Sequence, residues 1–217
     1  SNSVTLNQAA SAINLSTSVT HVLGCNGQNT GAIDLTVTGG IVAAAYTYAW
    51  TTNDGTIVAG EEDDQDLNTL VAGTYTVLVT DDNNCTETVS VTINEPTAIG
   101  ATSSKSNNNG YAVSCFNGTD GTATAVGSGG TVAGAYDYSW ANNNAPNTVI
   151  ATTATVTGLS AGTYTCTVKD DNDCSTTTSQ TLQAPAAVIS SVSATSVFTT
   201  VQISCYGEND GEATATA

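Results

Sequence analysis

A repeat of about 90 residues constrains the fold of this chain more than any other feature, because each copy must form one small structural unit. The aromatic pattern Tyr-x-Tyr-x-Trp at residues 46–50 returns 90 residues later, at 136–140. Further along, the interval shortens to 89 residues, which relates Pro96 to Pro185. The cysteines keep both intervals: Cys25, Cys115 and Cys205 lie 90 residues apart, and Cys85 and Cys174 lie 89 apart.

This register divides the 217 residues into four segments. Residues 1–6 are expected to end a preceding repeat, and residues 7–96 and 97–185 to form two complete repeats. Residues 186–217 match the start of a repeat and are expected to form its opening hairpin. The sequence therefore predicts two complete domains and part of a third.

Each repeat shows the period-2 alternation of strands that bury one face. In residues 46–50 the two tyrosines and the tryptophan share one face, and turn sequences such as Asn53-Asp54-Gly55 separate the alternating segments. Seven short strands fit into one repeat, which is typical of an immunoglobulin-like sandwich. We therefore predict an all-β protein of tandem immunoglobulin-like (fibronectin III/PKD-like) β-sandwich repeats.

Large aromatic rings in phase with other apolar residues are predicted to fill the sandwich cores. The sequence around two of the tyrosines also suggests a tyrosine corner, in which the hydroxyl bonds back to the backbone. The residues predicted to form the structural core are Trp50, Tyr75, Trp140 and Tyr164.

The charge balance excludes several functions. The chain carries 19 acidic residues against Lys105 and Lys169 and has no arginine, so its formal net charge is −17. Nucleic acids and anionic lipids bind clustered basic residues, so neither is expected as a partner. There is no apolar run of 18 residues, so no membrane insertion is expected. With His21 as the only histidine, we expect no enzymatic activity and no catalytic residues.

The cysteines indicate an oxidising, extracellular compartment, and two pairings remain open. Loops at opposite ends of a sandwich are separated by a strand length, whereas a disulfide needs Cα atoms within about 7 Å. A disulfide across the junction between repeats would then join Cys25 to Cys174. The alternative is pairing within each repeat, Cys25 with Cys85 and Cys115 with Cys174. Cys166, at the position of Val77, is expected to be an apolar filler.

Acidic residues gather near the same turns. Calcium takes six to eight oxygen ligands from loops of this kind, so calcium is the one candidate cofactor. The alternative is a solvated acidic surface in which the aspartates form turns. The candidate ligands are Asp81, Asp82, Asp120, Asp170, Asp171 and Asp173, and a separate acidic patch lies at residues 61–66.

The ordered motifs CFNGTDGTATA (115–125), Tyr-x-Tyr-x-Trp and GLSAGTYTCTVKDDNDC (158–174) resemble the SprB-type repeats of Bacteroidota surface adhesins. The segment 205–217, CYGENDGEATATA, repeats the opening motif. The resemblance implies export by the type IX system and a place at the extracellular cell surface. It also implies that neighbouring copies of the repeat, surface glycans and other cells are the candidate partners.

On these grounds we expect a structural and adhesive repeat region, a stiff stalk of tandem sandwiches in a cell-surface filament or giant adhesin. Two alternatives remain open. One is a set of carbohydrate-binding modules of a secreted enzyme, which would need exposed aromatic rings. The other is a subunit of an extracellular polymer built by strand exchange.

Overall fold

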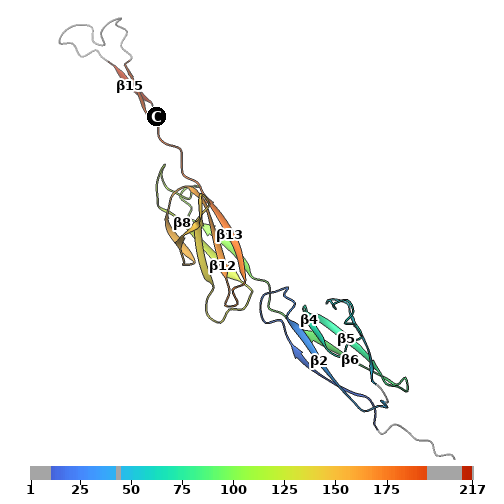
Figure 1. Ribbon diagram of the computed structural model, residues 1–217. Helices are drawn as coiled ribbons and strands as arrows, with labels where there is room; N and C mark the ends of the chain where they lie inside the picture. The colour runs from blue at the N-terminus through green and yellow to red at the C-terminus, as the bar shows by residue number, and fades with distance from the viewer. Residues whose placement is uncertain (1–10, 43–44, 195–211, 217) are drawn as a thin grey trace, which may run out of the picture.

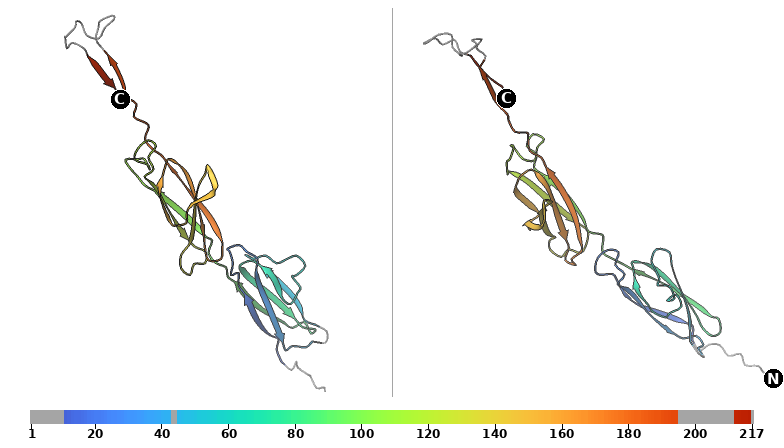
Figure 2. Two further views of the ribbon diagram at one scale, coloured as in Figure 1. Left: turned by 60° about the vertical axis from the view of Figure 1, so that its left-hand side comes forward. Right: turned by 45° about the horizontal axis from the view of Figure 1, so that its top comes forward.

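The computed structural model describes residues 11–42, 45–194 and 212–216, and it consists of β-strands joined by turns. Two β-sandwiches follow one another along an elongated molecule, and a separate hairpin lies beyond the second (Figure 1). Two further views show the same end-to-end arrangement (Figure 2). The chain is therefore an all-β protein of tandem immunoglobulin-like sandwiches.

The first sandwich packs two three-stranded antiparallel sheets face to face, in the orders β1-β2-β4 and β3-β5-β6. Its inner faces carry the apolar residues of the alternating segments, which is why β2 buries Gly31, Ile33 and Leu35 and β5 buries Tyr75, Val77 and Val79. The strands are β1 (Asn14–Thr20), β2 (Gly31–Thr38), β3 (Thr47–Thr52), β4 (Leu67–Leu70), β5 (Gly73–Thr80) and β6 (Thr86–Ile93).

The second sandwich has the same plan with one more strand. Its sheets have the orders β11-β8-β7 and β10-β9-β12-β13. The strands are β7 (Gly100–Lys105), β8 (Gly121–Ser128), β9 (Asp137–Asn142), β10 (Ala145–Ala151), β11 (Thr155–Leu159), β12 (Gly162–Lys169) and β13 (Ser175–Leu182).

Each sandwich has its own core. One cluster of buried residues is centred on Trp50 and Tyr75, and a second on Trp140 and Tyr164. The tyrosine hydroxyls donate hydrogen bonds to carbonyls four residues upstream, Tyr75 to Val71 at 2.9 Å and Tyr164 to Ser160 at 3.1 Å. This is the geometry of a tyrosine corner, and it fixes the turn before β5 and β12.

The expectation of seven strands in each repeat is wrong for the first sandwich, which has six described strands. Residues 53–66 form turns and bends where the second sandwich has β10. Side chains of this loop make the missing backbone contacts: Asp66 Oδ1 accepts the Leu35 N–H at 2.8 Å and Gln65 Nε2 donates to the Leu35 carbonyl at 2.5 Å. The acidic patch at 61–66 therefore contributes to the edge of the sandwich.

Beyond the second sandwich, β14 (Ser191–Ala194) pairs with β15 (Ala213–Thr216) as an antiparallel hairpin. Of the segment 186–217, expected to open a third repeat, the structure describes 186–194 and 212–216. Residues 1–6, expected to end a preceding repeat, and Cys205 lie outside the described residues.

Candidate functional site: the domain junction

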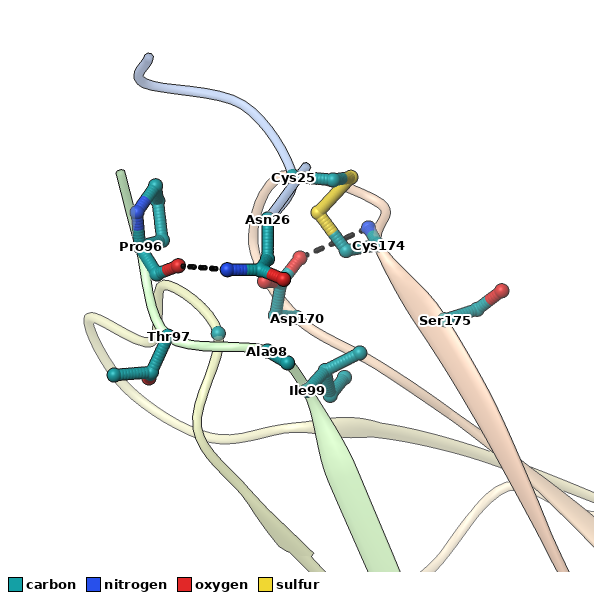
Figure 3. A pocket seen from close by; sticks show the side chains of 10 residues that line it. Cys25, Asn26, Pro96, Thr97, Ala98, Ile99, Asp170, Cys174 and Ser175 are labelled. Atoms are coloured by element: carbon teal, nitrogen blue, oxygen red, sulfur yellow. Dashed lines mark hydrogen bonds between the residues drawn. A yellow bond between two sulfur atoms is a disulfide. The ribbon is translucent and has the colours of Figure 1, made fainter. Parts of the chain in front are cut away.

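A disulfide between Cys25 and Cys174 joins the two sandwiches, with a Cα–Cα distance of 5.5 Å (Figure 3). Cys25 lies in the loop between β1 and β2, and Cys174 ends the turn between β12 and β13. The two residues are separated by 149 positions in the sequence. The bond therefore links the downstream end of the first domain to the upstream end of the second.

The turn that presents Cys174 is held by the buried carboxylate of Asp170. Asp170 Oδ1 accepts the N–H groups of Asn172 at 3.0 Å and Cys174 at 2.9 Å, and Oδ2 accepts the N–H of Thr131 at 2.9 Å. These bonds, with that from Thr131 foremost, lower the pKa of Asp170. Asp173 adopts a left-handed conformation, with φ of 60°, that closes the turn.

Three hydrogen-bonding side chains accompany the disulfide. Asn172 Nδ2 donates to the carbonyl of Leu23 at 2.7 Å, a second contact between the domains. Asn26 Nδ2 donates to the carbonyl of Pro96 in the linker at 3.0 Å (Figure 3), and Glu95 Oε2 accepts the N–H of Gly27 at 2.5 Å. The loop that carries Cys25 is therefore bound to the linker and to the second domain.

The linker is also held at both of its ends. On the first domain, the Asn94 carbonyl accepts the N–H of Val22 at 3.0 Å, and the Asn94 N–H donates to Nδ1 of His21 at 3.1 Å. On the second domain, the Thr97 carbonyl accepts the N–H of Gly130 at 2.9 Å. Because both ends and the disulfide are fixed, few backbone torsions remain free to bend the junction.

A cavity of about 260 Å³ lies beneath the disulfide and is lined by residues of both domains (Figure 3). Its lining includes Asn26, Pro96, Ile99, Asp170 and Ser175. Both Asp170 oxygens already accept backbone N–H groups, and the lining holds no histidine, lysine or arginine. The arrangement is suited to joining domains and lacks the paired acid and base of a catalytic site.

The alternative pairing within each repeat, Cys25 with Cys85 and Cys115 with Cys174, is not formed. Cys25 lies before β2, whereas the turn of Cys85 lies beyond the other end of that strand, where Asp81 Oδ2 accepts the Ile41 N–H at 3.0 Å. Eight strand residues separate the two ends, about 26 Å at ~3.3 Å per residue. The same separation in the second domain divides Cys115 from Cys174.

Among the described cysteines, Cys85, Cys115 and Cys166 carry free thiols. Cys85 and Cys115 are exposed. Cys166 is fully buried on the inner face of β12, and burial raises the pKa of its thiol.

The six aspartates considered as calcium ligands do not converge. Within the described part of the chain, no group of three or more histidine, cysteine, aspartate or glutamate side chains is placed to hold a metal ion. Asp81 and Asp170 are buried and bond to backbone N–H groups, and Asp120 Oδ1 accepts the N–H of Ser114 at 3.0 Å. Asp171 Oδ2 accepts the N–H of Ala133 at 2.5 Å, and Asp173 forms an exposed ion pair with Lys169 at 3.1 Å. Asp82 lies beside Asp81 in the turn at the other end of the first domain.

The sequence reasoning did not identify the polar residues of the junction. Asn26, Glu95 and Asn172 look like ordinary turn residues when they are considered one at a time. One signal was present: Asn172 stands two positions before Cys174, as Asn83 does before Cys85. A polar residue at a fixed distance from each turn cysteine indicates a shared environment.

Two segments of the chain match a known repeat family. Residues 17–57 and 113–145 match the SprB repeat family. Together the two SprB segments cover about a third of the chain, and each includes the cysteine loop, the second strand and the aromatic strand of its sandwich. No curated protein matches the chain. In the described residues, no helix is long and apolar enough to cross a membrane.

Solved structures with similar folds include three domains of the Hoc outer capsid protein of bacteriophage RB49, at 19% identity and a TM-score of 0.41 over 85% of this chain. A Dscam structure aligns over 82% of the chain at 17% identity and a TM-score of 0.34. The two Ig domains of DIP-gamma align over 80%, at 11% identity and 0.39, and 98% of that chain is covered. The chain spans 61% of the Hoc structure and 47% of the Dscam structure.

Proposed function

We propose that this chain is a non-enzymatic stalk segment of an extracellular, cell-surface adhesin. Residues 7–96 and 97–185 are its two complete repeats, and residue 186 starts the next. The observation that carries the proposal is the junction, where a disulfide and an amide hydrogen bond connect two domains that have separate cores. A stalk of such units resists bending, as a string of freely hinged domains does not.

Two other properties support the same function. A disulfide persists in an oxidising compartment, as expected outside the cell. The formal charge of −17 keeps an array of such domains soluble and apart from other acidic surfaces. The match to the SprB repeat supports the assignment to a surface adhesin. The partners that we propose are neighbouring repeats, surface glycans or other cells.

The buried tryptophans count against the carbohydrate-binding alternative. Trp50 and Trp140 are 3% and 0% exposed, and their Nε1 groups donate to the carbonyls of Asp64 and Thr153 inside the protein. Rings in this position cannot stack on a sugar. No observation on the described residues favours the other alternative, a polymer built by strand exchange between chains.

The stalk function is tested by the shape of the oxidised protein in solution. Small-angle scattering and negative-stain images of the chain are compared with those of the double variant Cys25→Ser, Cys174→Ser. We expect one interdomain angle for the native chain and a broad distribution of angles for the variant. The matched control, Cys85→Ser with Cys115→Ser, removes two cysteines that lie away from the junction and should keep the single angle. Equal distributions in all three proteins would exclude a stiffening role for the disulfide.

A further inference from the structure

The two exposed free thiols lie at opposite ends of the two-domain unit. Cys85 lies in the β5–β6 turn at the upstream end of the first domain, near Ser11 and Ile13. Cys115 lies in the β7–β8 loop at the downstream end of the second, where Ala112 N–H donates to the Gln183 carbonyl at 2.9 Å. The upstream end therefore presents a cysteine in the turn before the last strand, which we call a turn cysteine, as Cys174 is. The downstream end presents a cysteine in the loop between the first two strands, which we call a loop cysteine, as Cys25 is.

The turn of Cys85 has the conformation of the turn of Cys174. Asp81 Oδ1 accepts the N–H groups of Asn83 and Cys85, both at 2.9 Å, as Asp170 does for the residues of its own turn. Asn84 has φ of 61°, against 60° for the corresponding Asp173. The free end of the first domain thus already has the turn conformation that the second domain contributes to the junction.

From the cysteine onward, the loop of Cys115 likewise has the conformation of the loop of Cys25. The Cys115 carbonyl accepts the N–H of Gly118 at 3.0 Å, and the Cys25 carbonyl accepts the N–H of Gln28, 90 residues earlier, at 3.2 Å. Asn117 has φ of 56° where the corresponding Gly27 has 79°. The half contributed by the first domain is therefore also repeated, at the free end of the second.

The lining of the junction cavity recurs in part at each free end. At the upstream end a hollow of about 200 Å³ is lined by Ile13, Gly40, Asp81, Cys85 and Thr86. These residues correspond to Ile99, Gly130, Asp170, Cys174 and Ser175 of the junction cavity. At the downstream end, Phe116 and Pro185 line a separate hollow at the positions of Asn26 and Pro96.

We propose that Cys85 and Cys115 are the two half-sites of further interdomain disulfides, and that the partner of each is a second copy of this repeat. Cys115 bonds to the turn cysteine of the copy that follows, and Cys85 to the loop cysteine of the copy that precedes. This inference rests on the proposed stalk function and extends it. The contact is head to tail and does not close on itself, so it continues as a filament.

Polar groups beside the cysteines select this partner. At the existing junction Asn172 Nδ2 bonds to the carbonyls of Leu23 and Gly24, at 2.7 and 3.4 Å. The corresponding donor at the upstream end is the amide of the exposed Asn83. At the downstream end Val113, at the position of Leu23, is fully buried, so the corresponding acceptor is the carbonyl of the exposed Ser114, at the position of Gly24. A docked copy would bring this donor to this acceptor and the two sulfurs together.

Bond formation needs an oxidant, and we assign this to a small disulfide such as oxidised glutathione. The Cys115 thiolate attacks it, forms a mixed disulfide and releases one glutathione thiolate. The Cys85 thiolate of the next copy then attacks Cys115 Sγ, and the second glutathione thiolate leaves. Two protein thiols are oxidised to one disulfide, two glutathione thiols are produced, and these take up the two protons.

The test uses the full chain with the substitution Cys205→Ser, so that the remaining cysteines are Cys25, Cys85, Cys115, Cys166 and Cys174. The protein is incubated at high concentration in a glutathione redox buffer, and the products are separated on non-reducing gels and mapped as peptides. We expect a ladder of oligomers joined by Cys85–Cys115 peptides. Adding Cys85→Ser or Cys115→Ser should abolish this peptide and the ladder, with Cys25–Cys174 retained in both.

The variant Asn83→Ala distinguishes a disulfide formed by selective docking of two copies from one formed by random collision. This variant should form the Cys85–Cys115 bond several-fold more slowly, whereas its Cys85 should react with iodoacetamide at the native rate. Asn147→Ala, on exposed β10, is the matched control and should form ladders normally. The proposal is overturned if no ladder forms, or if Cys85–Cys85 and Cys115–Cys115 peptides are as abundant as the mixed pair. Either result leaves the bending measurement on the Cys25–Cys174 junction unaffected, so the two proposals fail separately.

Discussion

Asp81 and Asp170, 89 residues apart in the sequence, make the same three kinds of hydrogen bond in their two domains. One oxygen of each carboxylate accepts two N–H groups of the turn before the last strand. The other oxygen accepts an N–H from the loop that follows the second strand, at Ile41 or Thr131. Each carboxylate therefore ties the cysteine turn to the sandwich behind it.

The first prediction follows from the ionisation of these two groups. Backbone N–H groups bond to the charged form, so the pKa of both carboxylates lies below the ordinary value of 3.8. Their stabilising contribution is complete above the unfolded-state pKa and is lost as the pH falls through the lower folded-state pKa. We expect urea midpoints to fall steeply between about pH 4 and pH 2, and less steeply in Asp81→Asn, Asp170→Asn.

The control for this titration is Asp63→Asn, which alters an exposed aspartate outside the turns of Cys85 and Cys174. It should keep the native dependence of the urea midpoint on pH. A double variant whose midpoint fell as steeply as that of the native chain would show that other carboxylates cause the acid sensitivity.

Much of the fold follows from residues that recur. The alternation of Tyr75, Val77 and Val79 predicts a strand with one buried face, and the 90-residue interval predicts that the same architecture forms twice. The aspartates illustrate the limit of such reasoning. A pair such as Asp81-Asp82 suggests a metal ligand, and only the folded turn shows that the first carboxylate is already bonded by backbone N–H groups.

Sequence patterns also do not predict that the edges of the two sandwiches are bonded differently. Loop residues 61–66 have too little alternation to predict any contact, and their acidic character suggested solvent exposure. The structure instead uses Asp66 to bond the N–H of Leu35, whereas the corresponding Ala125 N–H in the second domain bonds to the backbone carbonyl of Ala154 at 2.9 Å. A side chain and a backbone carbonyl can satisfy one donor equally well, and sequence spacing does not distinguish them.

The second prediction concerns this bond. Asp66→Ala leaves the N–H of Leu35, a fully buried residue, without its acceptor, and should lower the free energy of unfolding of the first domain by about 1–3 kcal/mol. Asp66→Asn retains a side-chain oxygen and should lose less. Chemical denaturation followed by hydrogen exchange of the Leu35 amide measures both effects. Equal stability of Asp66→Ala and the native chain would contradict the structural role of this acid.

The third prediction concerns a polar layer in the second domain. Gln180 Nε2 donates to the Ser103 carbonyl at 2.8 Å and to the Ser103 hydroxyl at 3.1 Å, and the hydroxyls of Ser103 and Thr178 are 2.8 Å apart. Gln180 occupies the position of buried Val91 in the first domain. Because these groups satisfy one another, Gln180→Val and Ser103→Ala should each lower the unfolding free energy by about 1–2 kcal/mol.

The double variant Gln180→Val, Ser103→Ala should lose less than the sum of the two single losses, because it removes partners together. Urea denaturation of the four proteins completes the cycle. Strict additivity would show that the two side chains do not stabilise one another across β7 and β13.

The last prediction tests whether the two cores unfold independently. Trp140 is fully buried and belongs to the cluster of the second domain, whereas Trp50 belongs to that of the first. Trp140→Ala should therefore lower the unfolding free energy of the second domain by about 3–5 kcal/mol and leave hydrogen exchange in β2 and β5 unchanged. Trp140→Phe keeps most of the apolar area and loses only the bond from Nε1 to the Thr153 carbonyl, so it should lose less. If Trp140→Ala also exposed the amides of β5, the disulfide at Cys25 would have to transmit unfolding from one domain to the other, and the junction would couple the stabilities of the repeats as well as their orientation.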